Sequence, residues 1–131
     1  MAYVAAIAFA MSNNPRRALL DAENRKRYQE VYAHELAHKR AAGSLGGNIV
    51  IDKNADGLIT GGHVNIKMPS FNAANPLETK NHAQTVINAA MAPHDPSVQD
   101  FKVAAQARQI LNQAQQAISD QKSGKKLDIR A

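Results

Sequence analysis

The most regular pattern of apolar residues lies towards the C-terminus, in residues 97–122. Apolar positions recur there every three or four residues: Val103, Ala104, Ala107, Ile110, Leu111, Ala114, Ala117 and Ile118. This spacing predicts an amphipathic helix with one buried face, and the many alanines indicate close contact with another helix. Residues 77–91 provide that partner helix, and Asp95-Pro96-Ser97 between the two is typical of a helix start.

A longer helix is predicted over residues 15–43. Asn13-Asn14-Pro15 supplies an asparagine cap and a proline close to the first helical position, and Gly43 is a typical C-terminal cap. The N-terminal half of this segment is mostly polar, so we expect that half to project from the domain.

Residues 44–68 show a β pattern instead of a helical one. β-Branched residues at 49–51 and 59–60 flank Asn54-Ala55-Asp56-Gly57, which has the composition of a tight turn. A β-hairpin is therefore predicted, and Gly61-Gly62 indicates a bulge or a close approach of another backbone. The fold class is α+β and mostly helical: a long helix, a hairpin and two C-terminal helices in a single domain of residues 1–131.

The apolar segment at residues 1–14 is a separate case. It is shorter than a secretory signal and has no Lys or Arg before its apolar run, so a cleavable signal peptide is not expected. It is also far below the roughly 20 residues that span a bilayer. We expect a buried helix or edge strand, no membrane span, and a cytoplasmic location by default.

Composition restricts the chemistry. The chain has no cysteine, so any metal ligand must be His, Asp or Glu. The net charge of +5 is compatible with nucleic-acid binding. However, the basic residues lie among acidic ones in the sequence, and their clusters have no interleaved aromatic residues to stack on bases. Nucleic acid is therefore not the expected partner.

The segment His34-Glu35-Leu36-Ala37-His38 has the form H-E-x-x-H within the long predicted helix. Residues four apart lie on one helix face, so His34 and His38 can bind one zinc ion. Glu35 is then placed to take a proton from a water molecule at the same ion. The motif predicts a zinc site in which Glu35 is the catalytic general base.

A catalytic zinc site needs a third protein ligand. His63 is the expected one, because it follows Gly61-Gly62 on a hairpin that returns directly from the zinc helix. Four other candidates remain open, with Glu78 and His82 ahead of the rest: Glu78, His82, His94 and Asp95.

Two further roles in a zinc site, orienting a ligand and stabilising the oxyanion, each have several candidate residues. An acidic residue is expected to orient a ligand imidazole, and the candidates are Asp52, Asp95 and Asp100. A donor is expected to stabilise the oxyanion, and the candidates are Tyr32, His82, His94 and Arg108.

A second metal motif overlaps the predicted turn. Residues 52–59 match the first eight positions of an EF-hand calcium loop, but the twelfth position is His63 and not the bidentate glutamate that calcium requires. We therefore interpret the segment as a hairpin turn.

The run from Glu30 to Ala107 resembles the SprA-related metalloprotease catalytic domain family of bacteria. The shared features are Ala33-His34-Glu35-x-Ala37-His38, Ala42-Gly43, Gly46-Gly47, Asp56-Gly57, Gly61-Gly62, Ala89-Ala90-x-Ala92-Pro93, Pro96-Ser97-x-Gln99-Asp100 and Val103-Ala104. The resemblance implies a minimal zincin-like domain with peptidase activity. Family members usually carry Glu where this chain has His63, so a third ligand at that position would give a His-His-His site.

The resulting hypothesis is a zinc-dependent metallopeptidase that acts on a peptide or protein substrate. The alternative is a non-enzymatic structural or partner-binding protein built on a vestigial peptidase fold, and a calcium-stabilised hairpin scaffold is a third option. Substrate preference and oligomeric state do not follow from the sequence.

Overall fold

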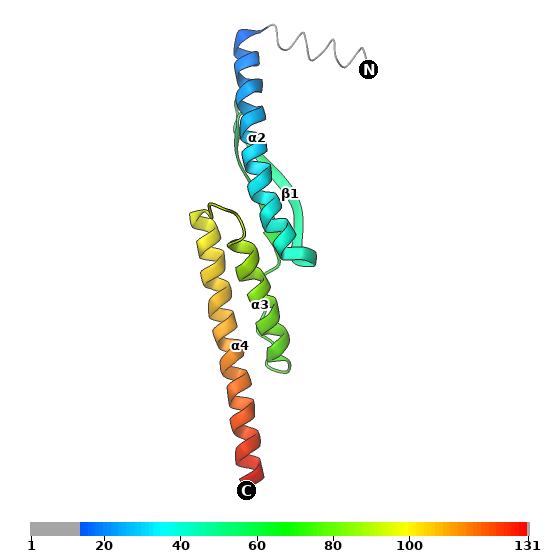
Figure 1. The fold of residues 1–131 in the computed structure, drawn as a ribbon, viewed down its shortest axis with the longest axis vertical. Helices are drawn as coiled ribbons and strands as arrows, with labels where there is room; N and C mark the ends of the chain where they lie inside the picture. The colour runs from blue at the N-terminus through cyan, green and yellow to red at the C-terminus, as the bar shows by residue number, and fades with distance from the viewer. Residues whose placement is uncertain (1–13, 131) are drawn as a thin grey trace.

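The computed structural model of the chain describes residues 14–130, so the predicted N-terminal apolar segment lies almost wholly outside the described residues. The elements follow in the order α2 (Pro15–Ala42), the short 3-10 helix η1 (Gly43–Leu45), β1 (Gly46–Lys53), β2 (Ile59–Ile66), α3 (Pro76–Ala90) and α4 (Val98–Arg130) (Figure 1). The predicted α+β arrangement of a long helix, a hairpin and two C-terminal helices is confirmed. No helix within residues 14–130 is both long enough and apolar enough to cross a membrane.

Helix α2 has the predicted ends. The side chain of Asn14 accepts hydrogen bonds from the backbone N–H groups of Arg16 and Arg17, so it satisfies donors that the first helical turn leaves unpaired. At the other end, Gly43 adopts φ 58°, a value that favours glycine, and the chain turns into η1.

The two strands form an antiparallel hairpin around the predicted turn. The side chain of Asn54 accepts hydrogen bonds from the backbone N–H groups of Asp56 and Leu58, and Gly57 has φ 83°. The residues that match the start of a calcium loop therefore serve as turn residues between β1 and β2.

The hairpin tip is attached to the N-terminal half of α2 by polar contacts. The amide of Asn24 donates to Gly57 O at 2.8 Å and accepts from Ile59 N at 2.9 Å. Arg27 adds a hydrogen bond to Ile59 O at 3.1 Å. This half of α2 does not project alone, as its polar sequence had indicated, because the long hairpin reaches back along the helix and binds its polar face.

Helices α3 and α4 run in opposite directions beside one another, and α4 continues well past the start of α3 (Figure 1). Val86 of α3 is fully buried, and so are Ala104, Ala107 and Ala114 from the predicted stripe of α4. Alanines at these positions allow the two helices to approach closely, as predicted.

The end of α3 lies against the C-terminal half of α2, where His38 contacts Ala89 O, and Asp100 at the start of α4 reaches His34 and His38 on the same half. Three chain segments that are distant in sequence therefore meet where α2 carries the His-Glu-x-x-His motif.

Candidate metal centre

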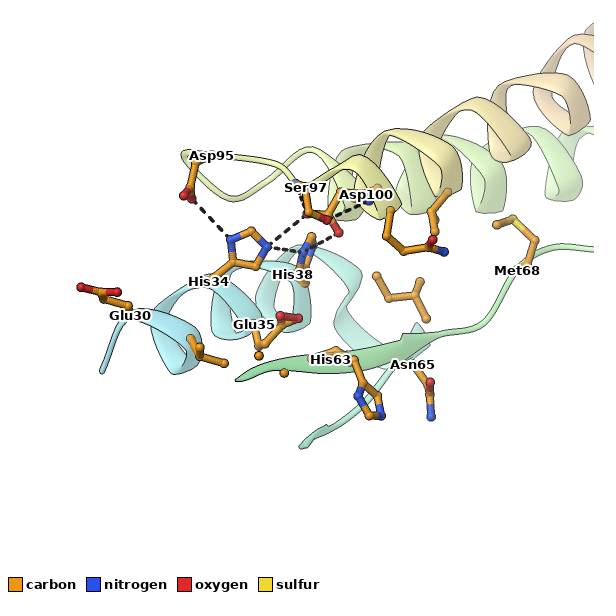
Figure 2. A pocket seen from close by; sticks show the side chains of 18 residues that line it. Glu30, His34, Glu35, His38, His63, Asn65, Met68, Asp95, Ser97 and Asp100 are labelled. Carbon is orange, nitrogen blue, oxygen red and sulfur yellow. Dashed lines mark hydrogen bonds and ion pairs between the residues drawn. The ribbon is translucent and has the colours of Figure 1, made fainter. Parts of the chain in front are cut away.

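His34 and His38 lie on one face of α2, and their imidazoles turn towards each other (Figure 2). Their Nε2 atoms are 3.2 Å apart. His38 is buried, with 4% of its surface exposed, because the end of α3 covers it. Together with Glu35 the two histidines form a group whose ligand-capable atoms all lie within 4.8 Å of one another, the size of a metal site.

The other nitrogen of each imidazole has a partner that fixes its proton. His38 Nδ1 lies 2.7 Å from Ala89 O, and a carbonyl can only accept, so this nitrogen donates. His34 Nδ1 lies 3.4 Å from a carboxylate oxygen of Asp95. With protons on both Nδ1 atoms, the Nε2 atoms of neutral histidines carry lone pairs directed at each other.

Asp100, in the first turn of α4, completes this cluster. One of its carboxylate oxygens is 3.1 Å from His34 Nε2, and the other is 3.1 Å from His38 Nε2. The same carboxylate accepts the backbone N–H of Ser97 at 2.8 Å, while the Ser97 hydroxyl accepts the N–H of Asp100 at 3.1 Å. This reciprocal pair is a capping box at the start of α4.

The donor set fits a cation. Three groups that accept hydrogen bonds, two imidazole Nε2 atoms and a carboxylate, converge with separations of 3.1 to 3.2 Å. Ligands at zinc distances of 2.0–2.1 Å in tetrahedral geometry lie about 3.3 Å apart. A positive charge between these atoms, whether a metal ion or a proton, removes the repulsion among their lone pairs. Nitrogen and oxygen donors of this kind suit zinc.

Glu35 occupies the space between α2 and β2, and only 5% of its surface is exposed. Burial raises the pKa of its carboxyl group above the ordinary value of 4.5, and the charges of His38 and His34 act in the opposite direction. A carboxyl group with a raised pKa holds a proton more readily near neutral pH, which suits a residue that must accept and release one.

This raised pKa predicts how the stability of the metal-free protein depends on pH. The folded state binds the Glu35 proton more tightly than the unfolded state does, so Glu35 lowers stability as pH rises from about 4.5 through the folded-state pKa. Glu35→Gln removes this contribution. We expect the Tm advantage of the variant over wild type, measured in chelator, to be smallest near pH 4 and to grow towards pH 8. A constant difference across this range would contradict the prediction.

The structure does not bring the expected third ligand, His63, to the histidine pair. Gly62 faces Val31 and Glu35 on α2, and successive side chains of a strand point to opposite faces, so His63 points away from α2. Its side chain lies on the far side of β2 from His34 and His38 (Figure 2). It is half exposed, and its Nδ1 lies 3.1 Å from a carboxylate oxygen of Asp52.

The remaining candidates have other partners or positions. Glu78 accepts a hydrogen bond from the Asn75 amide at the start of α3, and His82 Nε2 forms a hydrogen bond with Lys67 O. His94 is exposed. A carboxylate oxygen of Asp95 lies near His34 Nδ1, the ring nitrogen that does not face His38, and this is the position expected for a residue that orients a ligand. Asp52 instead pairs with His63.

A cleft of about 600 Å³ adjoins the cluster. It is bounded by α2, by β2 and by the segment that leads into α4; the lining includes Glu30, Val31, Gly61, Val64, Asn65, Met68, Ser97, Gln99 and Val103. The oxyanion donors proposed from sequence, Tyr32, His82, His94 and Arg108, are not among the lining residues.

The sequence indicates Asp100 only as one candidate to orient a ligand, and it does not predict the direct approach of Asp100 to both Nε2 atoms. A local signal was present, because Ser97 followed three residues later by an acid marks a capping box and fixes where that acid points. What the spacing alone did not give was the packing of this helix start against α2.

The fold and site together define an α+β domain whose first described helix carries an H-E-x-x-H group with its ligand-capable atoms close enough together to hold a metal ion. The chain belongs to the SprA-related family, whose model matches residues 13–128. Comparisons with curated proteins and with solved structures found no significant match.

Proposed function

We propose that this protein is a zinc-dependent peptidase in which His34 and His38 bind the metal and Glu35 is the general base. The observation that carries the proposal is the single helical turn that presents two imidazole Nε2 atoms 3.2 Å apart with a buried carboxylate beside them. Membership in the SprA-related family is consistent with this activity.

His34 and His38 would hold the zinc ion, which when bound would supply a Lewis acid to acidify water and polarise the scissile carbonyl. Glu35 accepts a proton as water attacks the carbonyl carbon, and donates that proton to the amine nitrogen as the carbon–nitrogen bond breaks. The products are a carboxylic acid and an amine, so atoms and charge balance. Ala89 O and the Asp95 carboxylate hold the imidazoles in the tautomer that leaves both Nε2 atoms free to bind metal.

The cleft has room for a substrate of peptide size. Its volume of about 600 Å³ lies within the range of small-molecule and short-peptide sites. Val31, Val64 and Val103 contribute apolar surface, while Asn65 and Gln99 offer hydrogen-bonding groups. This mixture offers a short peptide segment both apolar contacts and hydrogen-bond partners.

The first test is the metal content of the protein purified without added metal, measured by elemental mass spectrometry. We expect about one zinc per chain, and its loss in His38→Gln. A peptide library digested by the wild type should remain intact in the presence of a chelator. If the protein holds no zinc and takes none up at micromolar concentrations, the enzyme proposal fails and a non-enzymatic role as a structural or partner-binding protein is favoured.

A further inference from the structure

We propose that Asp100 is the third protein ligand of the metal, so that the site is His-His-Asp and joins α2 to the start of α4. This inference rests on the proposed metal site and specifies it further. His63, the candidate favoured by the sequence, then has no part in binding the metal.

The distances support one centre shared by three residues. Oδ2 of Asp100 lies 3.1 Å from His34 Nε2, Oδ1 lies 3.1 Å from His38 Nε2, and the two Nε2 atoms are 3.2 Å apart, so four ligand-capable atoms of three residues face one another. An ion pair with one histidine would require only one of these approaches. A carboxylate that contacts both Nε2 atoms, one with each oxygen, has the position of a ligand that shares an ion with the two histidines.

Capping of α4 does not account for the whole of this geometry. The bond from Ser97 N uses only Oδ2 of Asp100, which also lies near His34. The other oxygen, Oδ1, has no role in the cap and faces His38 Nε2. The cap therefore fixes the carboxylate in place, which reduces the entropy lost on binding metal and leaves oxygen lone pairs free for the ion.

The neighbouring acids are less suitable. The side chain of Asp95 is 89% exposed and approaches the outer nitrogen of His34, on the side away from His38. Glu35 packs between α2 and Gly62, beside the histidines, where a general base is needed. Asp100 has a side chain that is only 15% exposed, as expected for a ligand enclosed by protein.

The test is zinc affinity, measured by competition with a chelator of known affinity. Asp100→Asn keeps the shape of the side chain and an oxygen for the Ser97 N–H, but removes the anionic ligand. We expect its zinc affinity to fall by more than about 100-fold, which exceeds the roughly 10-fold to 100-fold typical of residues that only orient ligands. Asp95→Asn should lose about 10-fold, and His63→Gln should bind as the wild type does.

Three results separate the possible failures. An Asp100→Asn protein that binds zinc within about 100-fold of wild type behaves as an orienting residue would and overturns the assignment of Asp100, while the peptidase proposal survives. A His63→Gln protein that loses zinc overturns the assignment of Asp100 and identifies His63 as the third ligand. A wild-type protein that binds no zinc refutes the metal site itself, and with it both proposals.

A second measurement needs no variant and applies even if Asp100→Asn does not fold. The amide of Ser97 donates to the Asp100 carboxylate, so its NMR shift reports on that carboxylate. On addition of zinc, we expect the amide resonances of Ser97 and Asp100 to move together with those of His34 and His38. Movement of the histidine amides alone would overturn the assignment.

Discussion

Replacing Glu35 with glutamine will reduce peptide hydrolysis by about 10²-fold to 10⁴-fold, the usual contribution of a general base. Glutamine has nearly the same shape and fills the same space between α2 and β2, but its amide cannot accept a proton from water. Zinc content should remain at about one per chain, because the two histidine ligands are unchanged. The rate is measured at saturating zinc on a peptide that the wild type cleaves.

Glu78→Gln is the matched control for this experiment. It makes the same chemical change on α3, where the carboxylate only accepts a hydrogen bond from Asn75 and the amide oxygen of glutamine can replace it. We expect the activity of this variant to equal that of wild type. If Glu35→Gln retains full activity, or loses activity only in proportion to lost zinc, Glu35 is not the base.

The second large effect concerns the paired glycines of β2. A Cβ atom at Gly62 would lie 2.6 Å from Val31 Cγ1 and 2.8 Å from Val50 O. The second of these contacts is with backbone, so a side-chain rotation does not relieve it and the strand must move away from α2. We expect Gly62→Ala to lower the free energy of unfolding by about 1–3 kcal/mol, the usual cost of overpacking. Hydrolysis should fall as well, because Glu35 packs against the same glycine.

Gly61 is the control for this substitution. A Cβ atom there meets no atom within 4 Å, and its φ is not positive, so alanine fits without strain. We expect Gly61→Ala to change stability by less than about 0.5 kcal/mol. Denaturant unfolding of the two variants compares the same added methyl group at adjacent positions. Equal effects at the two positions would show that the close approach of β2 to α2 does not determine stability.

The elements of the fold were predictable because each carries a local signal. Asn14 and Gly43 mark the ends of α2, the turn at 54–57 sets the hairpin, and the alanine stripe identifies the buried face of α4. The geometry of His34 and His38 also follows from the helix alone, since residues four apart share a face. These features require no knowledge of how the elements pack.

Predicting which further side chains approach the histidine pair does require knowledge of the packing. Strand periodicity shows that Gly62 and His63 point to opposite faces, but it does not say which face meets α2. The structure shows that Gly62 does, which leaves His63 on the outer side. Likewise, the approach of Asp100 to the histidines depends on the docking of α4, which brings together residues 66 positions apart. Sequence spacing alone does not determine a contact of that range.

The contact between His38 and Ala89 O joins residues 51 positions apart, and it places a limit on the order of events during folding. In an unfolded chain, the imidazoles of His34 and His38 have no fixed relative position, and no carbonyl oxygen sets the tautomer of His38. In the proposed site, tight zinc binding requires the docking of α3 and α4 on α2, so we expect zinc to bind after these helices have docked and not to start folding. Zinc bound in this way would stabilise molecules that have already folded, and free zinc at a hundred times the dissociation constant would add about 2.7 kcal/mol to their stability.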